Sequence, residues 1–139
     1  MIATVSSAKK GEQARRAGAD LVVNYRQEDV VAKTLAFTGH RGVDRVVDVD
    51  FGGNLATTLK LMAVNSAIAV YATNGNRTPV VPIRELMDKC IALRPLVLFA
   101  LPPALLAAAQ ADISKWLAAG DRLHTIAAQY PLSETAQAH

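Results

Sequence analysis

Two serines and a lysine follow a short apolar run near the start of the chain, and together these residue types could bind an anion. The run Ile2–Val5 is followed by Ser6 and Ser7, and Lys10 comes three residues later. Hydroxyl and ammonium groups donate hydrogen bonds to phosphate oxygens, and no acid directly follows the run to repel a negative charge. The alternative interpretation is that the serines cap a helix and Lys10 is a solvated side chain, although a capping serine could also contact phosphate.

Loops that contain glycine or polar residues also follow two later apolar runs. They are Phe51, Gly52, Gly53 and Asn54 after the first of these runs, and Ala72, Thr73 and Asn74 after the second. If both runs are parallel strands, their carboxyl ends meet at the edge of the sheet where such folds bind ligands. Glycine at this edge lets the backbone approach a ligand closely, and the alternative interpretation is a tight turn from strand to helix.

The acids and the cysteine near these runs predict neither a catalytic group nor a metal site. We interpret Asp50 as a residue that caps the next helix or bonds loop amides, rather than as a catalytic carboxylate beside Asp48. Cys90 is the single cysteine, so we expect it to pack as a small apolar side chain. The three histidines have no metal-ligand spacing, and we predict no metal.

The elements that must position these residues are indicated by alternating apolar runs and helical patterns. We expect strands at Ile2–Val5, Leu21–Val23, Asp44–Val49, Ala67–Ala72, Leu96–Leu101 and Leu123–Ala128. We expect helices at Ala8–Ala17, Asp29–Phe37, Ile83–Ala92 and Ala104–Ala119, one more that carries Leu55, Leu59 and Met62 on one face, and a last one capped by Ser133. Continuous apolar strands between helices are typical of a parallel sheet that is buried on both faces. The sequence therefore predicts an α/β fold with a doubly wound, mainly parallel, Rossmann-like sheet.

Composition limits the class of protein. The chain has 139 residues, which suits one domain, and its 51% hydrophobic and 19% charged residues suit a packed core rather than disorder. A net charge of +3, with no long basic run, argues against a nucleic-acid partner. No apolar stretch reaches the roughly 18 residues of a membrane span, and we expect a cytoplasmic protein without a membrane partner.

Eight short motifs follow one another in order and without large gaps. They are Ile2–Lys10, Ala17–Asp20, Val23–Arg26, Thr38–Asp44, Val47–Gly53, Leu59–Met62, Tyr71–Gly75 and Pro131–His139. This series resembles the medium-chain dehydrogenase/reductase superfamily, and within it most of all the nucleotide-binding domain of the zinc-independent NADPH:quinone reductases. The resemblance implies hydride transfer from NADPH to a quinone or another conjugated carbonyl, without a metal.

The same resemblance implies roles for the residues at the strand ends. In similar reductases a lysine and a tyrosine fifteen residues later flank the 2′-phosphate of NADPH, and here they would be Lys10 and Tyr25. Since an NAD site places an acid at the end of that strand, its absence also favours NADPH over NADH. The segment Ala72–Asn74 would lie beside the nicotinamide ribose. No catalytic residue can be assigned.

Compared with members of that family, this chain is expected to lack the first strand of the nucleotide-binding domain, the glycine-rich loop after it and the N-terminal substrate domain. We therefore expect residues 1–139 to form one partial dinucleotide-binding domain with weak or no activity in isolation. A sheet in the order 3-2-1-4-5-6 without its first strand has a gap, and each unmade ladder bond left dry costs roughly 1–3 kcal/mol. We expect the halves to close up, another segment to fill the gap, or a partner to complete the sheet.

The apolar run Leu96–Leu101 has a different expected use. An exposed apolar edge strand favours pairing, and in the family that it resembles such a strand pairs with its copy across a two-fold axis. We therefore expect a homodimer through Leu96–Leu101, unless this strand is an internal sheet edge covered by the helix Ala104–Ala119, where we expect Trp116 to be a core residue. The alternative function is a non-catalytic dimerisation or binding module.

Overall fold

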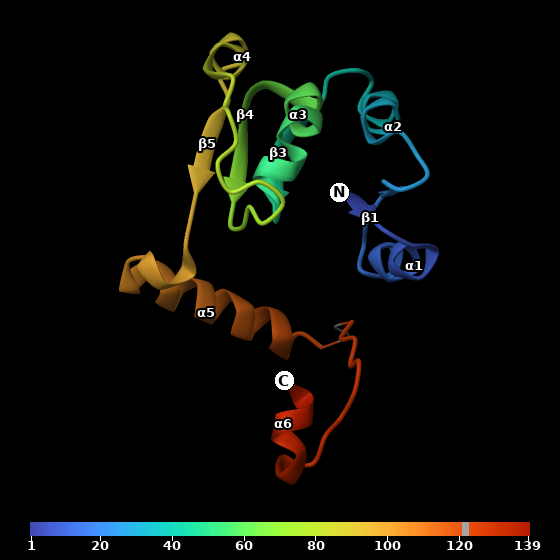
Figure 1. Ribbon diagram of the computed structural model, residues 1–139, viewed down its shortest axis with the longest axis vertical. Helices are drawn as coiled ribbons and strands as arrows, with labels where there is room; N and C mark the ends of the chain where they lie inside the picture. Colours follow the sequence, from blue (N-terminus) through green and yellow to red (C-terminus); the bar gives the residue numbers. More distant parts are fainter. Residues whose placement is uncertain (121–122) are drawn as a thin grey trace.

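Helices and strands alternate along most of the chain in the computed structural model, which describes residues 1–120 and 123–139 (Figure 1). In order, the elements are β1 (Ile2–Val5), α1 (Ala8–Arg16), β2 (Leu21–Asn24), α2 (Val30–Phe37), β3 (Val43–Asp48), α3 (Phe51–Leu61), β4 (Met62–Val70), α4 (Ile83–Asp88), β5 (Ala92–Pro95), α5 (Pro103–Ala118) and α6 (Thr135–Ala138). Short 3₁₀ turns occupy Leu98–Ala100 and Leu132–Glu134. All strand ladders are parallel, so the predicted α/β class is confirmed.

The strands form two separate sheets rather than one. β1 pairs with β2, and β4 lies between β3 and β5. The two sheets are linked through the contact of α2 with α3. The halves have not closed up into one sheet, and no described segment fills the gap that the sequence predicts between them.

Local signals account for the first two helices. The Ser7 side chain accepts a hydrogen bond from the Lys10 amide at 3.3 Å and caps α1, while Asp29 caps α2 by accepting from the Ala32 amide at 3.0 Å. Gly18 follows α1 with φ +98°, in the left-handed region that favours glycine. These caps explain why the helix starts near Ala8 and Asp29 are predicted within one residue.

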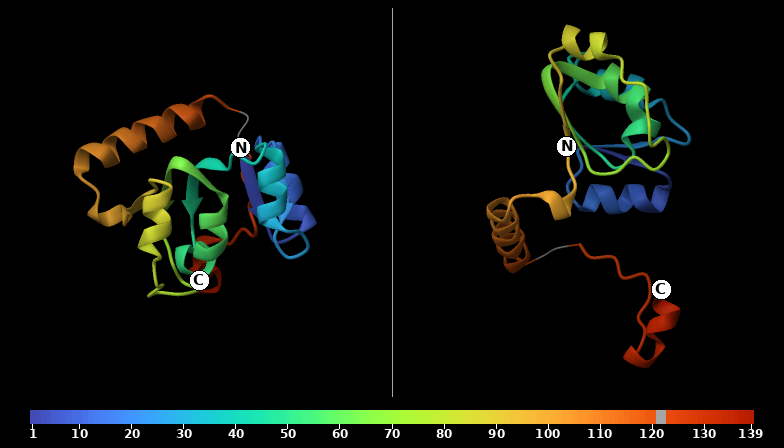
Figure 2. Two further views of the ribbon diagram at one scale, coloured as in Figure 1. Left: turned by 90° about the horizontal axis from the view of Figure 1, so that it is seen from above. Right: turned by 60° about the vertical axis from the view of Figure 1, so that its left-hand side comes forward.

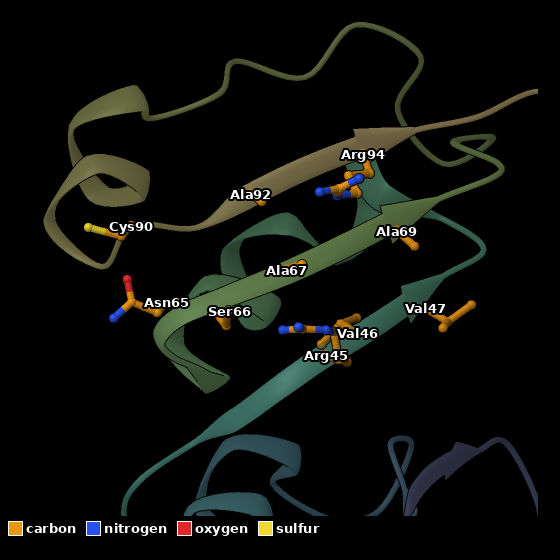
Figure 3. Close-up of a pocket in the computed structure, with 10 residues that line it drawn as sticks. All are labelled: Arg45, Val46, Val47, Asn65, Ser66, Ala67, Ala69, Cys90, Ala92 and Arg94. Atoms are coloured by element: carbon orange, nitrogen blue, oxygen red, sulfur yellow. The ribbon is translucent and has the colours of Figure 1, made fainter.

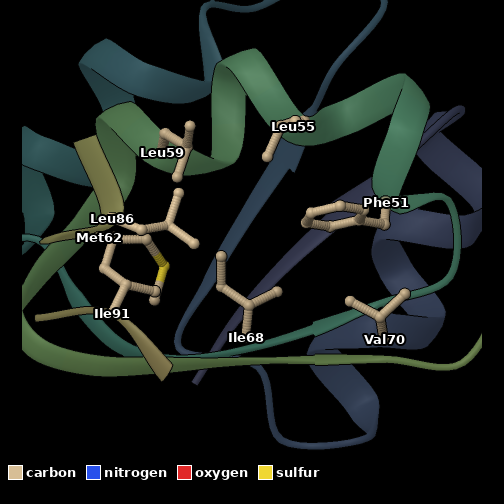
Figure 4. Packing of buried hydrophobic residues seen from close by; sticks show 8 residues of the cluster. All are labelled: Phe51, Leu55, Leu59, Met62, Ile68, Val70, Leu86 and Ile91. Atoms are coloured by element: carbon tan, nitrogen blue, oxygen red, sulfur yellow. The ribbon is translucent and has the colours of Figure 1, made fainter. Parts of the chain in front are cut away.

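The core lies between the three-stranded sheet and the helices α3 and α4 (Figure 4). Its buried members are Phe51, Leu55, Leu59, Met62, Ile68, Val70, Leu86 and Ile91. The predicted apolar face of Leu55, Leu59 and Met62 is therefore confirmed as core, although Met62 already begins β4. Gly42 has φ +84° at the start of β3, and a Cβ there would come within 2.5 Å of the Leu61 carbonyl oxygen.

Two predicted strands are wrong. Leu96–Leu101 contains a 3₁₀ turn, and β5 instead runs over Ala92–Pro95, whose first residue lies in the helix that the sequence predicts. That helix, α4, ends at Asp88, so the following strand begins earlier in the chain than predicted. The last bond of this strand to the sheet is donated by the Leu96 amide to the Val70 carbonyl at 2.8 Å. Leu123–Ala128 has no regular structure.

Two side chains expected to be buried are exposed. Cys90 lies on the surface with φ +51°, two residues after the end of α4, so its interpretation as a packed side chain is wrong. Trp116 is 51% exposed, because α5 extends away from both sheets and buries none of its residues (Figure 2). Ser133 lies in a 3₁₀ turn, and the last helix begins two residues later. None of the described helices is both long and apolar enough to cross a bilayer.

Candidate functional site

The first predicted group, Ser6, Ser7, Lys10 and Tyr25, lies at the carboxyl end of the two-stranded sheet. The parallel register of β1 and β2 brings both strand ends to one edge. The Tyr25 amide donates to the Val5 carbonyl at 3.1 Å, so the residue after β2 is bonded to the end of β1. Lys10 is exposed, and so is Tyr25, which is 52% exposed. Ser7 caps α1, as the alternative interpretation predicts, and its hydroxyl lies beside the backbone amide of Lys10.

The turn that carries Tyr25 is held by a small polar network. The Glu28 carboxylate accepts from the Asn24 amide at 2.8 Å, and its other oxygen lies 3.0 Å from the Lys33 ammonium. The Asn24 side chain in turn accepts from the Arg26 amide at 3.1 Å. The Asn24 amide and, secondarily, Lys33 hold the pKa of Glu28 below its ordinary value. The sequence pattern gave no indication of this support for Tyr25.

Replacing Lys33 tests whether the Asn24 amide lowers the pKa of Glu28 more than Lys33 does. In Lys33→Met we expect the pKa of Glu28 to rise but to stay below its ordinary value, because the bond from the Asn24 amide remains. Because folding lowers the pKa of Glu28, its ionised carboxylate stabilises the folded state. This stabilisation is complete above roughly pH 4.3, the pKa in the unfolded chain, and is lost as the pH falls through the folded pKa. NMR titration of the side-chain carboxyl measures the pKa of Glu28 in the unmodified chain and in the variant. Lys60→Met is the control, and a fully ordinary pKa in Lys33→Met would contradict the role of the Asn24 amide.

The second predicted group lies at the carboxyl ends of β3 and β4. An isolated bridge joins Asp50 to Thr73, and the Phe51 amide donates to the Ala72 carbonyl at 3.1 Å. The Gly52 amide donates to the Thr73 hydroxyl at 3.0 Å. The structure therefore brings the start of α3 and the loop after β4 together, as the parallel arrangement predicts.

Close packing at this edge depends on Gly52. A Cβ on Gly52 would overlap the carbonyl oxygen of Asn76, and the Thr73 hydroxyl donates to the same oxygen at 2.6 Å. The glycine thus permits close approach of a loop of the same chain, which corresponds to the tight-turn alternative. Asn76 was not among the predicted residues, and its only sequence signal is the polar Asn-Gly-Asn loop. A cavity of about 360 Å³ is lined by Gly52 and Asn76 among others.

Phe51 does not present its side chain at this edge. Phe51 is 6% exposed and its ring belongs to the core, and its amide is already bonded to Ala72. The Phe51 side chain packs in the core because an aromatic ring at the first turn of α3 finds apolar partners beneath the helix, and Phe51 stays a predicted cofactor contact. Asn74 is exposed, whereas Ala72 and Thr73 are half-buried.

The two acids at this edge have structural partners. Asp48 is 4% exposed and accepts from the Asp50 amide at 2.8 Å and from the Asn54 side chain at 2.9 Å. Asp50 accepts from the Gly75 amide at 2.7 Å, so its interpretation as a residue that bonds loop amides is confirmed. In the described part of the chain, no cluster of three or more His, Cys, Asp or Glu residues could hold a metal ion.

The described cavities do not unite the two groups. The larger one, of about 570 Å³, lies on the three-stranded sheet and is lined by Arg45, Ala67 and Arg94 among others (Figure 3). It contains no predicted site residue. We therefore base the candidate site on the strand ends rather than on the size of a cavity, since ligands of such folds bind at the carboxyl edge.

Comparison with known proteins places the chain among oxidoreductases. The family model described as zinc-binding dehydrogenase matches residues 1–111. The quinone oxidoreductase of Lama guanicoe is 26% identical over 123 residues, which cover 88% of this chain but 36% of the relative. The chain thus spans about a third of the length of this curated relative.

Solved structures show the same fold. The Escherichia coli quinone oxidoreductase, solved in complex with NADPH, matches with a TM-score of 0.76 and 25% identity over 91% of this chain and 40% of that one. The quinone oxidoreductase of Pseudomonas syringae pv. tomato matches with a TM-score of 0.81 and 24% identity over 99% of this chain and 43% of that one. The separated sheets therefore correspond to parts of one Rossmann-like domain in larger proteins.

Proposed function

This chain belongs to the zinc-binding dehydrogenase family, and on that basis we propose that residues 1–139 form the NADPH-binding part of an oxidoreductase that transfers hydride to a quinone or another conjugated carbonyl. The single observation that carries the proposal is the edge at which Ser7, Lys10 and Tyr25 follow two parallel strands without an acid among them. The activity of the whole protein is part of the proposal, because the chain spans 36% of its curated relative.

Each residue at the first edge has a proposed part in binding the 2′-phosphate of NADPH. The exposed Lys10 ammonium pairs with the phosphate, and the hydroxyls of Ser6 and Ser7 donate hydrogen bonds to its oxygens. Tyr25 lies at the other strand end and covers the phosphate or the adjacent ribose. An NAD site would need a carboxylate here for the ribose hydroxyl, and a carboxylate would repel the phosphate.

The second edge is proposed to position the nicotinamide half of the cofactor. The exposed Asn74 side chain and the loop backbone at Ala72 and Thr73 face this part, while Gly52 keeps the loop close to α3. When bound, NADPH supplies the hydride, and these residues orient its ring.

Nucleotide titration of the 139-residue chain tests the proposal. We expect NADPH to bind more tightly than NADH, and Lys10→Ala to weaken NADPH binding by roughly tenfold or more, because a charge-assisted hydrogen bond contributes about 1.5–3 kcal/mol. NADH binding should change little in this variant. The matched control is Lys9→Ala, since Lys9 is the neighbouring exposed lysine of α1. Equal affinity of the chain for both nucleotides would refute the assignment of the 2′-phosphate site.

A non-catalytic dimerisation or binding module is the second candidate function. The observation that favours it is the exposed apolar surface of the C-terminal third, where Phe99 is 94% exposed and α5 buries no residue. Tight self-association of a chain that binds neither nucleotide would favour this candidate. Because Leu96–Leu101 is not a strand, the expected strand pairing between copies does not enter the proposal.

A further inference from the structure

The turn that follows β2 closes around one carboxylate. The amides of Gln27 and Glu28 both donate to the Asn24 carbonyl at 2.9 Å. In the opposite direction, a carboxylate oxygen of Glu28 accepts from the Asn24 amide at 2.8 Å. Asn24 and Glu28 are thus bonded in both directions, and Tyr25, the tyrosine of the proposed 2′-phosphate site, lies between them in the chain. The turn therefore fixes the backbone at Tyr25 through contacts that do not involve its ring.

The Asn24 amide needs an acceptor because it lies at an open edge of the sheet. β2 pairs only with β1 in the described part of the chain, and the Tyr25 amide donates to Val5 of β1 at 3.1 Å. Successive amides of a strand point to opposite sides, so the Asn24 amide points away from β1. Without Glu28, water would have to replace that acceptor. Glu28 therefore holds the end of β2 on the side that β1 does not reach.

Cations of two other elements act on the same carboxylate. Its second oxygen lies 3.0 Å from the Lys33 ammonium of α2. The pKa of Glu28 is lowered mainly by the bond from the Asn24 amide, then by Lys33, and to a smaller extent by the positive charge of Arg15 on α1. Lys10 belongs to the same helix, α1. Glu28 thus links the turn of Tyr25 to α2 through an ion pair and to α1 through charge attraction.

The two predicted phosphate contacts depend on this arrangement to different degrees. Lys10 lies in the first turn of α1, which Ser7 caps by accepting from the Lys10 amide at 3.3 Å. Tyr25 is 52% exposed, so its position is set by the backbone that carries it more than by packing. A turn that has to be ordered when a ligand binds costs affinity, whereas a turn ordered beforehand does not. Loss of the Glu28 bond should therefore weaken the contact of Tyr25 with a phosphate and leave the helix of Lys10 intact.

From these contacts we propose that Glu28 is a positioning residue: the bond that it accepts from the Asn24 amide holds Tyr25 where the 2′-phosphate of NADPH binds. This inference rests on the proposed NADPH-binding function and deepens it. Glu28 does not itself contact the nucleotide, because its two oxygens are engaged by Asn24 and Lys33 and a carboxylate would repel the phosphate. The preference for NADPH over NADH thus depends on a residue outside the contact surface.

Nucleotide titration of the 139-residue chain with Glu28→Ala and Glu28→Gln tests the inference. In Glu28→Ala the Asn24 amide loses its acceptor, and we expect NADPH to bind about threefold to tenfold more weakly, the usual effect of having to order a side chain on binding. NADH, which lacks the 2′-phosphate, should bind almost unchanged. Glu28→Gln is the matched control, since its side-chain oxygen still accepts from the Asn24 amide, and it should keep the NADPH preference of the unmodified chain.

The two variants also separate positioning from charge, because both remove the negative charge of Glu28. If Glu28 acted by repelling the phosphate, both variants would bind NADPH more tightly. If it acted only as a charged partner of Lys33, both would lose the NADPH preference equally. Either result would overturn the inference, as would an unchanged ratio of the NADPH and NADH affinities in a folded Glu28→Ala chain.

Hydrogen exchange provides a readout that needs no nucleotide. The Asn24 amide should exchange faster in Glu28→Ala than in the unmodified chain and at an unchanged rate in Glu28→Gln, and circular dichroism checks that both variants are folded. If Glu28→Ala does not fold, Glu28→Asp, whose carboxylate is one methylene shorter, takes its place with the same expected losses. A chain that binds NADPH and NADH equally well refutes the proposed function together with this inference. A preference for NADPH that survives the loss of the Asn24 bond refutes this inference alone.

Discussion

Gly52→Ala is expected to lower the free energy of unfolding by about 3 kcal/mol, the upper part of the range for overpacked sites. The new methyl group would overlap the carbonyl oxygen of Asn76, which is backbone and moves only together with its loop. Displacing that loop also breaks the bond from the Gly52 amide to the Thr73 hydroxyl. Denaturant unfolding measures the loss, and nucleotide affinity should fall with it if this edge holds the nicotinamide half.

Gly53→Ala is the matched control for this prediction. Its methyl group would come within 2.5 Å of a carboxylate oxygen of Asp50, a side chain that can rotate away from Gly75. Adding Asp50→Ala should therefore remove most of the cost of Gly53→Ala and leave the cost of Gly52→Ala unchanged. Rescue of Gly52→Ala by Asp50→Ala would show that the obstacle is not the Asn76 backbone.

The second large effect is expected at the centre of the core. Ile68 is fully buried on β4, between α3 and α4, so Ile68→Ala should lower the free energy of unfolding by about 2–5 kcal/mol through lost apolar contacts and a residual cavity. Val64→Ala on the same strand is the control, because Val64 is 63% exposed and its truncation should change stability by less than about 0.5 kcal/mol. Equal losses in the two variants would contradict the assigned core.

The elements that sequence predicts correctly are those with local signals. Ser7 and Asp29 cap helices through bonds to amides three residues later, so the signal and the structure lie within one turn. The prediction of a strand at Leu96–Leu101 was wrong because an apolar run indicates that residues are buried. It does not by itself distinguish a strand from a 3₁₀ turn that lies between two prolines. Because α4 is shorter than predicted, β5 begins earlier in the chain than the predicted strand. Only the pairing of β5 with β4, which ends at Val70, reveals this difference.

The candidate site was predicted better as a location than as a set of contacts. Parallel strand ends meet at one edge by topology, and in the structure the Tyr25 amide is bonded to Val5 at the end of β1. The pairing of Lys10 with Tyr25 at a phosphate stays a prediction. The burial of Phe51 and the support of Tyr25 by Glu28 depend on side-chain packing and on a bond to a backbone amide. Neither leaves a periodic signal in the sequence.

The division of the strands into two sheets has a consequence for cooperativity. The β1–β2 unit contributes only Val5, Val23 and the glycine of α1 to the buried interior, whereas the β3–β4–β5 unit holds the main core. The smaller unit should therefore open at lower free energy, and its amides should exchange with solvent sooner. A dinucleotide that contacts Lys10 at one end and Asn74 at the other would span both units and raise the free energy needed to open the smaller one. Binding would then slow hydrogen exchange in β1 and β2 far more than in β4.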